Sequence, residues 1–546
     1  MVSINLYLTP QSDTRGKVVG ILVKQTIEQP AITSGNLLCS RPLKRLNRVP
    51  WRYSQEGLTA SDDHGPLVLS TTAPDGNQNG SEWTVDRNTA GYVVLRYHAV
   101  PASTGVIEHH GGLCAIGGEF LSLPPETDGE YHIALDWNLS HTHSEARAVW
   151  NYGDGSGPIT KEGSCSMIAD SVFMVGSVQR YPPQEDLPRK QHVVGSSCIF
   201  YWLGELPNNL ACLKEFGVGM FKKQAIQFKD EDSEYRIFIA KVTRGLTAKS
   251  LPGCLLFEYD EEAASTDNDA ILVRVMNRAI VQNWVGLDTA PGGESSDWYS
   301  EGIAQLYTIF FPFRFGFRTP DYFRGTLNAF LTDYYTNPEI NAPMSVALGG
   351  DSADWYLKHI PRARGLLYFL KVDFYTRRAS WEQNLGILRP MDEIIVKLSQ
   401  RRRHGEKIYV KDWLESLYPL LGKEATDSYY QDMLAGKIIE LDDMPAAFGA
   451  THDATLVEQE TLSFGFDYGS LEAGVISGIT NGSSADLAGL KNGDTIVSYS
   501  RVDACVEDIA WQMHLNIERD RRQIVIGFKP RSSSLARTWQ VMKVRD

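Results

Sequence analysis

The short run W-Y-S-E-G at residues 298–302 constrains the fold more than any other feature of the chain. Upstream, 18 residues separate Glu301 from Gln282, and Arg278 lies four positions before Gln282. Positions i and i+4 share one face of a helix, so Arg278 and Gln282 would project together from a helix over 271–284. A buried carboxylate needs a partner, and a guanidinium can supply one through two parallel hydrogen bonds. A guanidinium at Arg278 could therefore partner the Glu301 carboxylate if the fold brings the two together; the alternative is that Arg278 is a surface residue.

The composition is that of an ordinary globular protein, with 42% hydrophobic and 22% charged residues. A length of 546 residues predicts about three domains. The net charge of −14, without a basic stripe, argues against nucleic acid as a partner. No apolar run of about 18 residues predicts a membrane span, and no secretory signal is recognisable. The seven cysteines are scattered without C-x-x-C spacing, which favours reduced thiols and a cytoplasmic protein.

The chain changes character twice, and this predicts a multidomain α+β fold. Residues 1–180 hold β-branched and aromatic runs bounded by turn residues, which predicts an antiparallel β domain. Residues 181–455 are dominated by apolar spacing typical of helices, which predicts a mainly α domain. Residues 460–546 return to strand-like runs and form a third predicted domain, with one strand expected at 474–479.

The most specific local pattern is the run S-S-A-D-L-A-G-L-K-N-G-D-T-I at residues 483–496. It resembles the core S-P-A-x-x-A-G-L-x-x-G-D-x-I of PDZ domains, and so implies a C-terminal PDZ domain. The resemblance places a peptide-binding loop at Phe464, Gly465 and Phe466, where the sequence is only partly like G-L-G-F. The backbone N–H groups of such a loop bind a C-terminal carboxylate, and the peptide adds as a strand. Use of this domain within the chain itself is the alternative.

Three further patterns occur in the order expected of one enzyme family. W-Y-S-E-G resembles the W-[FY]-x-E-G segment of gluzincin metallopeptidases, and Trp284 fits the tryptophan of their H-E-x-x-H-x-W helix. Residues 135–153 resemble a W-D-L-S…A-x-W-S-x-G stretch. Arg364-Gly365, followed by Asp373 and Arg377, resembles a K-G…D-x-x-x-R helix. Over nearly its full length the chain is similar to the glycyl aminopeptidase family of gluzincins, peptidase family sixty-one, which implies a thermolysin-like α domain.

The resemblance also implies where zinc would bind, and most of the required residues are missing. Arg278 and Gln282 stand at the two histidine positions, Ala279 at the general base and Glu301 at the third ligand. Arginine cannot ligate zinc, a glutamine amide is a weak neutral ligand, and alanine cannot move a proton. The tyrosines that precede K-G in the family are replaced by I-P-R-A-R at 360–364. We therefore expect a degenerate motif with no metal or other cofactor, in which Arg278 replaces the charge of zinc.

Aromatic residues are frequent just before and after Glu301, among them Tyr299, Tyr307, Phe310 and Phe311. Such a segment predicts a cleft wall that suits an apolar or aromatic ligand. The alternative is a packed helical core.

Three functions follow from these patterns. The first is a repurposed, metal-independent enzyme, cyclase-like or isomerase-like and part of a biosynthetic pathway, in which Glu301, Arg278 and Arg362 act on an apolar small molecule. The second is a non-catalytic pseudopeptidase, a scaffold that binds peptide termini through its PDZ domain. The third is an active aminopeptidase with atypical ligands. The sequence names no substrate, pathway or oligomeric state.

Overall fold

The computed structural model describes residues 2–41, 50–53, 57–72, 81–101, 111–125, 129–183, 197–242, 245–261, 269–290, 296–349, 354–442, 444 and 452–543. The chain forms two compact units, one of Met1–Ile226 with Asp230–Asn283 and one of Gln227–Lys229 with Trp284–Asp546. The predicted domain boundaries near residues 180 and 455 differ from this division and stay predictions. Several sheets and many helices are present, so the α+β class is confirmed.

The first unit begins with an eight-stranded sheet in the order β14-β11-β1-β2-β9-β5-β6, with β4 paired to β9. In β1 the buried Ile4, Leu6 and Leu8 alternate with exposed positions, as expected of a strand with one face in the core. The prediction of a purely antiparallel domain is wrong, because β1 runs parallel to β11. More than a hundred residues connect these strands, which is ample for the crossover that a parallel pair requires.

Two smaller sheets accompany this one, in the orders β10-β15-β12-β13 and β3-β8-β7. The elements of these three sheets, with two short helices, are β1 Val2–Ser12, β2 Val18–Ile27, β3 Leu37–Arg41, β4 Arg52–Tyr53, β5 Thr59–Asp62, β6 Gly65–Leu67, β7 Leu69–Thr72, β8 Ser81–Val85, β9 Val93–Val100, β10 Leu113–Ile116, α1 Gly117–Phe120, β11 Tyr131–Trp137, β12 Arg147–Trp150, β13 Gly153–Asp154, β14 Ile159–Gly163, α2 Cys165–Ala169 and β15 Val172–Gly176.

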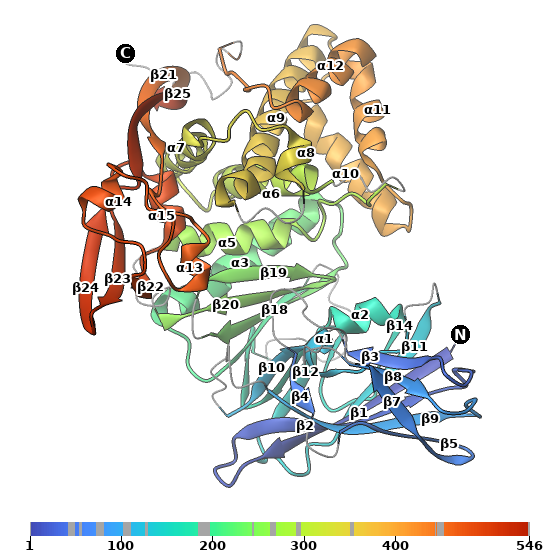
Figure 1. The fold of residues 1–546 in the computed structure, drawn as a ribbon. Coiled ribbons are helices and arrows are strands. Elements are labelled where there is room, and N and C mark those ends of the chain that lie inside the picture. The colour runs from blue at the N-terminus through green and yellow to red at the C-terminus, as the bar shows by residue number, and fades with distance from the viewer. Residues whose placement is uncertain are drawn as a thin grey trace. The chain divides into compact units, whose positions relative to one another are not determined.

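The first unit ends with a five-stranded sheet in the order β16-β17-β18-β20-β19, on which two helices pack (Figure 1). A side chain at Gly217 of α3 would meet Phe200 of β17 and Met276 of α5, so these three elements are in close contact. The elements are β16 Val178–Tyr181, β17 Ser197–Leu203, α3 Asn208–Gln227, β18 Glu234–Lys241, β19 Thr247–Leu251, β20 Cys254–Tyr259 and α5 Asp269–Val281.

The second unit begins with helices packed around α9, the longest of those described. The Asp354 side chain caps α9 by accepting from the Tyr356 N–H at 2.8 Å, and Thr319 caps α7 in the same way. The helices are α6 Asp297–Arg314, α7 Pro320–Thr336, α8 Met344–Ala347, α9 Trp355–Glu382, α10 Pro390–Arg403, α11 Val410–Leu421 and α12 Lys423–Leu434.

A C-terminal module of strands and short helices, residues 452–543, completes the second unit. A ribbon of β21 and β25 lies against α7 (Figure 1), where the Asn328 amide both donates to and accepts from the Val541 backbone. A separate three-stranded sheet has the order β22-β23-β24. The elements are β21 His452–Leu462, α13 Ser470–Ala473, α14 Ser484–Leu487, β22 Thr495–Tyr499, α15 Val502–Glu507, β23 Met513–Arg519, β24 Arg522–Phe528 and β25 Arg531–Lys543.

The strand expected at 474–479 is not formed, and only an isolated bridge joins Val475 to Thr495. Gly474 and Gly478 both have positive φ, at 76° and 64°, and this backbone conformation interrupts a strand ladder. The short helix α13 ends directly before Gly474.

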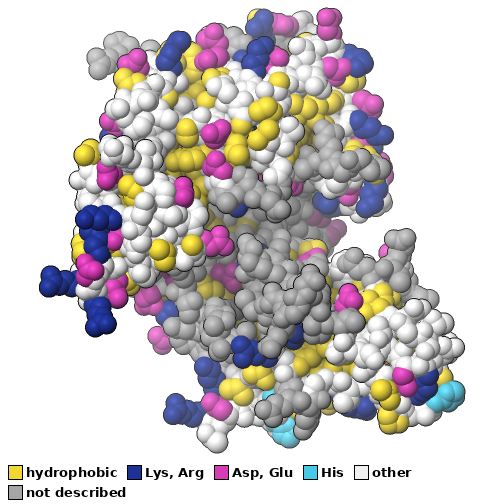
Figure 2. Space-filling model, in the orientation of Figure 1, with side chains coloured by type: hydrophobic (Ala, Val, Ile, Leu, Met, Phe, Trp, Pro, Cys, Tyr) yellow, Lys and Arg dark blue, Asp and Glu magenta, His cyan; other side chains and the backbone are white. Residues whose placement is uncertain are grey.

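Acidic and basic side chains are interspersed over the face of the molecule in Figure 2. Within the described residues, no helix is both long and apolar enough to cross a membrane. Cys212 is exposed, whereas the other six cysteines are buried.

Candidate functional site

The end of α5 carries the residues at three of the four zinc-motif positions. Arg278 lies in the last turn of α5, and the Gln282 N–H donates to the Arg278 carbonyl at 3.2 Å. Both side chains are half-buried, whereas Ala279 is fully buried. The predicted helix is therefore confirmed.

The donors at these positions do not fit a zinc ion. A guanidinium offers only N–H donors, an alanine offers nothing, and a glutamine offers one neutral oxygen, whereas zinc sites use imidazole, thiolate and carboxylate. In the part of the chain that the structure describes, no group of three or more His, Cys, Asp or Glu residues could hold a metal ion.

The W-Y-S-E-G run forms the first turns of α6, where this helix crosses α9 at backbone contact. A Cβ atom built on Gly302 would lie 2.5 Å from the carbonyl carbon of Gly365, and one on Gly365 would lie 2.3 Å from the Trp298 oxygen. Real Cβ atoms do not approach so closely, so both positions require glycine. The Trp298 ring stacks on Phe369 of α9 at 5.8 Å. The glycines of two separate sequence patterns thus meet in one helix crossing.

Glu301 precedes this contact and is half-buried. Arg278 belongs to the first compact unit and Glu301 to the second, so their predicted ion pair stays a prediction.

Three of the four residues predicted to line a cleft lie instead in a packed core. A packed helical core was the alternative interpretation of this aromatic segment. Tyr299, Tyr307 and Phe311 are at most 2% exposed, and Phe310 is half-buried. The Tyr299 ring contacts Phe369 and Trp413, and Phe310 contacts Phe323. The Tyr307 ring stacks on Phe311 at 4.2 Å, and its hydroxyl donates to a carboxyl oxygen of Asp392 at 2.9 Å.

The environment of Tyr307 keeps its hydroxyl protonated. Burial and the neighbouring Asp392 carboxylate raise the pKa of Tyr307 well above its usual range. Arg314 donates to the other carboxyl oxygen of Asp392 at 2.7 Å, so this buried carboxylate has two donors. The group is therefore suited to structural hydrogen bonding rather than to proton transfer.

The structure brings the third predicted catalytic residue, Arg362, together with Asp333 and His359. Arg362 Nη2 lies 3.4 Å from Asp333 Oδ2 and 3.0 Å from His359 Nδ1. Asp333 is 2% exposed. Burial raises the pKa of Asp333, but the hydrogen bonds and charges of His359 and Arg362 outweigh burial, so its pKa lies below the ordinary value. Asp333 is therefore an ionised carboxylate that holds a guanidinium and an imidazole.

Sequence reasoning did not identify Asp333 and His359. The sequence could have indicated His359, because it lies three residues before Arg362 and residues three apart on a helix are neighbours. Asp333 lies on α7, and only the packing of α7 against α9 places it there.

The predicted peptide-binding loop is closed by contacts within the chain. The Phe464 N–H donates to the Tyr356 hydroxyl of α9 at 3.0 Å, and the Phe464 side chain is fully buried. Gly465 has a φ of 75°, and its carbonyl accepts from the Thr480 N–H. Phe466 is 7% exposed. A carboxylate bound at the Phe464 N–H would have to displace the Tyr356 hydroxyl.

A pocket that the sequence did not predict lies between α9, α11 and α12 in the second unit. The signal for it was the spacing of Tyr368, Val372, Tyr375 and Ala379, which places all four on one face of α9. An apolar face at this spacing usually indicates core, and the sequence cannot show that the packing leaves part of it open.

One solved structure, of an aminopeptidase N family protein, is similar in fold to nearly the whole chain. An aminopeptidase N family protein from Idiomarina loihiensis has a TM-score of 0.67 and 14% identity, covering 99% of this chain and 98% of that chain. An M1 zinc metallopeptidase from Deinococcus radiodurans, in a mutant form bound to a Tyr-Ser-Ala substrate, has a TM-score of 0.48 and 14% identity, over 81% and 96%. Native yeast LTA4 hydrolase has a TM-score of 0.47 and 13% identity, over 79% and 68%. No protein-family model and no curated protein matches the chain.

Proposed function

We propose that this chain has an aminopeptidase-like fold whose zinc motif is degenerate, and that it has lost zinc peptidase chemistry. The observation that carries the proposal is the donor set of Arg278, Ala279 and Gln282, at the positions where the sequence pattern places two histidines and a general base. Loss of the metal removes both the Lewis acid and the activated water, and loss of the base removes the proton acceptor. Each loss alone disables hydrolysis.

The residues that remain suit a metal-independent role. We propose that Glu301, Arg278 and Arg362 bind an apolar small molecule or support a non-hydrolytic reaction of the cyclase or isomerase type. The Arg362–His359–Asp333 cluster supports this, since a guanidinium and an imidazole held by an ionised carboxylate provide a fixed positive charge and a proton carrier.

The second candidate is a non-catalytic scaffold. The folded C-terminal module favours it, because the run at 483–496 forms the expected short helix α14 and the Gly493-Asp494 turn into β22. The Phe464–Tyr356 hydrogen bond argues against capture of an external peptide terminus by the predicted loop.

Zinc binding distinguishes these proposals from an active aminopeptidase. The wild-type chain, incubated with zinc, desalted and analysed for bound metal, should hold well under one zinc per chain and should not cleave aminoacyl nitroanilides. Stoichiometric tight zinc in the wild type would refute the proposal.

A matched variant tests whether the site geometry persists. R278H/Q282H restores the two histidines of the pattern and leaves the buried Ala279 unchanged. It should gain about one zinc per chain without gaining peptidase activity, because the sequence pattern assigns the third ligand to Glu301 and the base of the pattern is still missing. The single variant R278H, with one histidine and one carboxylate, is the control and should bind zinc weakly.

A further inference from the structure

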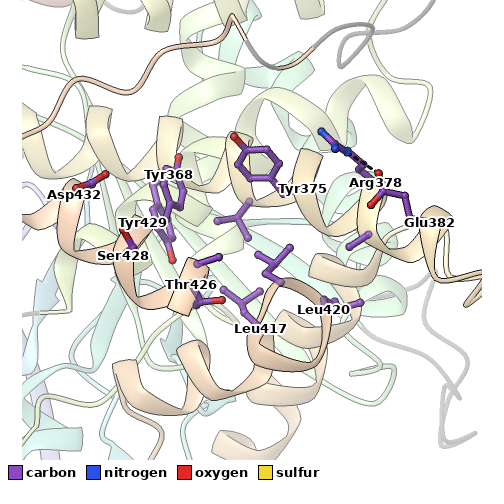
Figure 3. A pocket seen from close by; sticks show the side chains of 14 residues that line it. Tyr368, Tyr375, Arg378, Glu382, Leu417, Leu420, Thr426, Ser428, Tyr429 and Asp432 are labelled. Atoms are coloured by element: carbon purple, nitrogen blue, oxygen red, sulfur yellow. Dashed lines mark hydrogen bonds and ion pairs between the residues drawn. The ribbon is translucent and has the colours of Figure 1, made fainter. Parts of the chain in front are cut away.

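A pocket of about 490 Å³ lies between α9, α11 and α12 (Figure 3). This volume falls within the roughly 300–1,000 Å³ range of small-molecule sites. None of the residues proposed above at the zinc positions, and none of the Arg362 cluster, lines it. The residues that line it are Tyr368, Val372, Tyr375, Arg378, Ala379, Glu382, Leu417, Leu420, Leu421, Ala425, Thr426, Ser428, Tyr429 and Asp432.

The walls of the pocket are aromatic and its floor is aliphatic. The Tyr429 ring stacks on Tyr368 with centroids 5.2 Å apart and planes 13° apart, and it meets Tyr375 at 84° (Figure 3). Val372 and Leu417 are at most 1% exposed and close the floor. Aromatic faces and edges at right angles favour a planar aromatic ligand over a flexible aliphatic one.

The charged side chains of the pocket are already compensated. Arg378 pairs with Glu382 at 2.8 Å on one side of the opening, as Figure 3 shows. Asp432 pairs with Lys437 at 2.8 Å on another. Lys371 is not among the lining residues; its Nζ lies 5.9 Å from the ring centroids of Tyr375 and Tyr429 and donates to the Glu440 carbonyl. A charged ligand would lose its hydration without meeting an uncompensated opposite charge among the lining residues, and that loss is costly in an apolar pocket. The lining therefore favours a neutral ligand.

Contacts behind the lining hold the pocket in shape. The Trp413 indole of α11 donates to the Tyr368 hydroxyl at 3.2 Å and ties α11 to α9. The Gln383 amide donates to the Leu420 carbonyl at 3.1 Å, and the Thr426 hydroxyl donates to the Gly422 carbonyl at 2.7 Å. Walls fixed in this way need little rearrangement when a ligand enters.

We propose that the cavity between α9, α11 and α12 is a binding site for a neutral, planar aromatic small molecule. This inference does not depend on the proposed function, because the two residue sets do not overlap and either can fail alone.

Fluorescence titration of the full chain with the neutral probe N-phenylnaphthylamine tests the site. The wild type should bind the probe saturably, at one equivalent per chain. Ala425 lines the pocket and is itself exposed, so Ala425→Trp fills the opening without disturbing the core. This variant should weaken probe binding by at least about tenfold, since the ligand and the new ring compete for one space. Gln431→Trp adds the same ring to an exposed position of α12 outside the pocket and should leave probe affinity unchanged.

Two further measurements test the ligand class. Tyr429→Leu keeps an apolar wall and removes the ring, so it should weaken the probe by about threefold to tenfold. Anilinonaphthalene sulfonate carries similar rings with a negative charge and should displace the probe only at concentrations at least about tenfold higher.

Unchanged probe affinity in Ala425→Trp, with wild-type circular dichroism and thermal midpoint, would overturn the site. If anilinonaphthalene sulfonate displaced the probe as effectively as a neutral competitor, the inference of a neutral ligand would be overturned. If Tyr429→Leu left probe affinity unchanged, the inference of an aromatic ligand would be overturned.

Discussion

The crossing of α6 and α9 and the end of α5 both contain residues of one enzyme-like sequence pattern. The two regions differ in whether their residues match the pattern and in whether those residues serve packing or chemistry. At the crossing, Gly302 and Gly365 match the pattern and allow two helix backbones to touch. Arg278 in the last turn of α5 and Gln282 directly after the helix depart from the pattern, and neither is an ordinary zinc ligand. Helix packing is needed for folding whatever the chemistry, whereas metal ligands are needed only for catalysis. The glycines of the pattern are therefore explained by helix packing alone, whatever the chemistry of the chain.

Arg364, next to the crossing, illustrates the same point. Its side chain is fully buried, and its guanidinium donates to the carbonyls of Ala342 at 2.7 Å and Ile340 at 2.5 Å. Burial lowers the pKa of Arg364, and the carbonyls accept from its two terminal nitrogens. In a sequence pattern this arginine resembles a functional residue, but here it joins α9 to the segment after α7.

The largest expected effect comes from adding one methyl group at the crossing. Gly365→Ala would normally favour a helix, but its Cβ would lie 2.3 Å from the Trp298 oxygen. We expect a loss of about 3 kcal/mol in the free energy of unfolding, because the helices must separate. Urea unfolding followed by circular dichroism measures it.

The control is Gly325→Ala on α7, where nothing lies within 4 Å of the new atom. It should stabilise the chain by about 0.5–1 kcal/mol. If Gly365→Ala and Gly325→Ala changed the free energy of unfolding equally, the inference that helix packing requires glycine at 365 but not at 325 would be wrong.

A smaller effect is expected at Asp494, the aspartate of the G-D pair. Arg519 donates to both its carboxyl oxygens at 2.6 Å, and the Lys491 N–H donates at 2.8 Å. Burial raises the pKa of Asp494, but the Arg519 hydrogen bonds outweigh burial and lower it. Asp494→Asn should cost about 2 kcal/mol at neutral pH.

The pH dependence has a definite sign. Because the pKa of Asp494 is lower in the folded chain, its contribution is complete above the ordinary aspartate pKa of about 3.9 and is lost as pH falls through the folded value. Thermal midpoints from pH 7 to pH 3 should therefore converge for wild type and Asp494→Asn. Asp520→Asn removes the same charge at an exposed turn and should track the wild type.

The smallest effect concerns the loop at Phe464. Tyr356→Phe removes the hydroxyl that accepts from the Phe464 N–H and should cost about 1 kcal/mol. In calorimetry, the wild type should bind a peptide with a free C-terminus no better than the amidated peptide. A clear preference of the wild type for the free carboxylate would contradict internal use of the loop and favour the scaffold.

The coarse fold was predictable because it depends on local patterns. Apolar spacing identified the helix α5, and β-branched and aromatic runs bounded by turn residues identified the β-rich character of residues 1–180. The parallel pairing of β1 with β11 was not predictable, since it joins segments far apart in the sequence. The strand expected at 474–479 is absent because Gly474 and Gly478 have positive φ angles. The sequence permits these conformations but does not require them.

The candidate site divides in the same way. The family resemblance of the sequence pointed to Arg278, Gln282, Glu301 and Arg362, and it did not point to Asp333 or to the Tyr356–Phe464 contact. Those contacts join residues from different helices or from a helix and the C-terminal module. Pairwise distances of this kind depend on packing, which no single segment specifies.

The sequence by itself determined which side-chain donors stand at positions 278, 279 and 282, and an arginine and an alanine cannot become zinc ligands in any fold. Tertiary structure alone decided that Tyr299, Tyr307 and Phe311 are core, whereas Tyr368, Tyr375 and Tyr429 border an open pocket. All six are aromatic residues on helices, so their letters do not distinguish them. The physical reason is that a side chain's chemistry is local, whereas its exposure depends on how closely neighbouring helices pack.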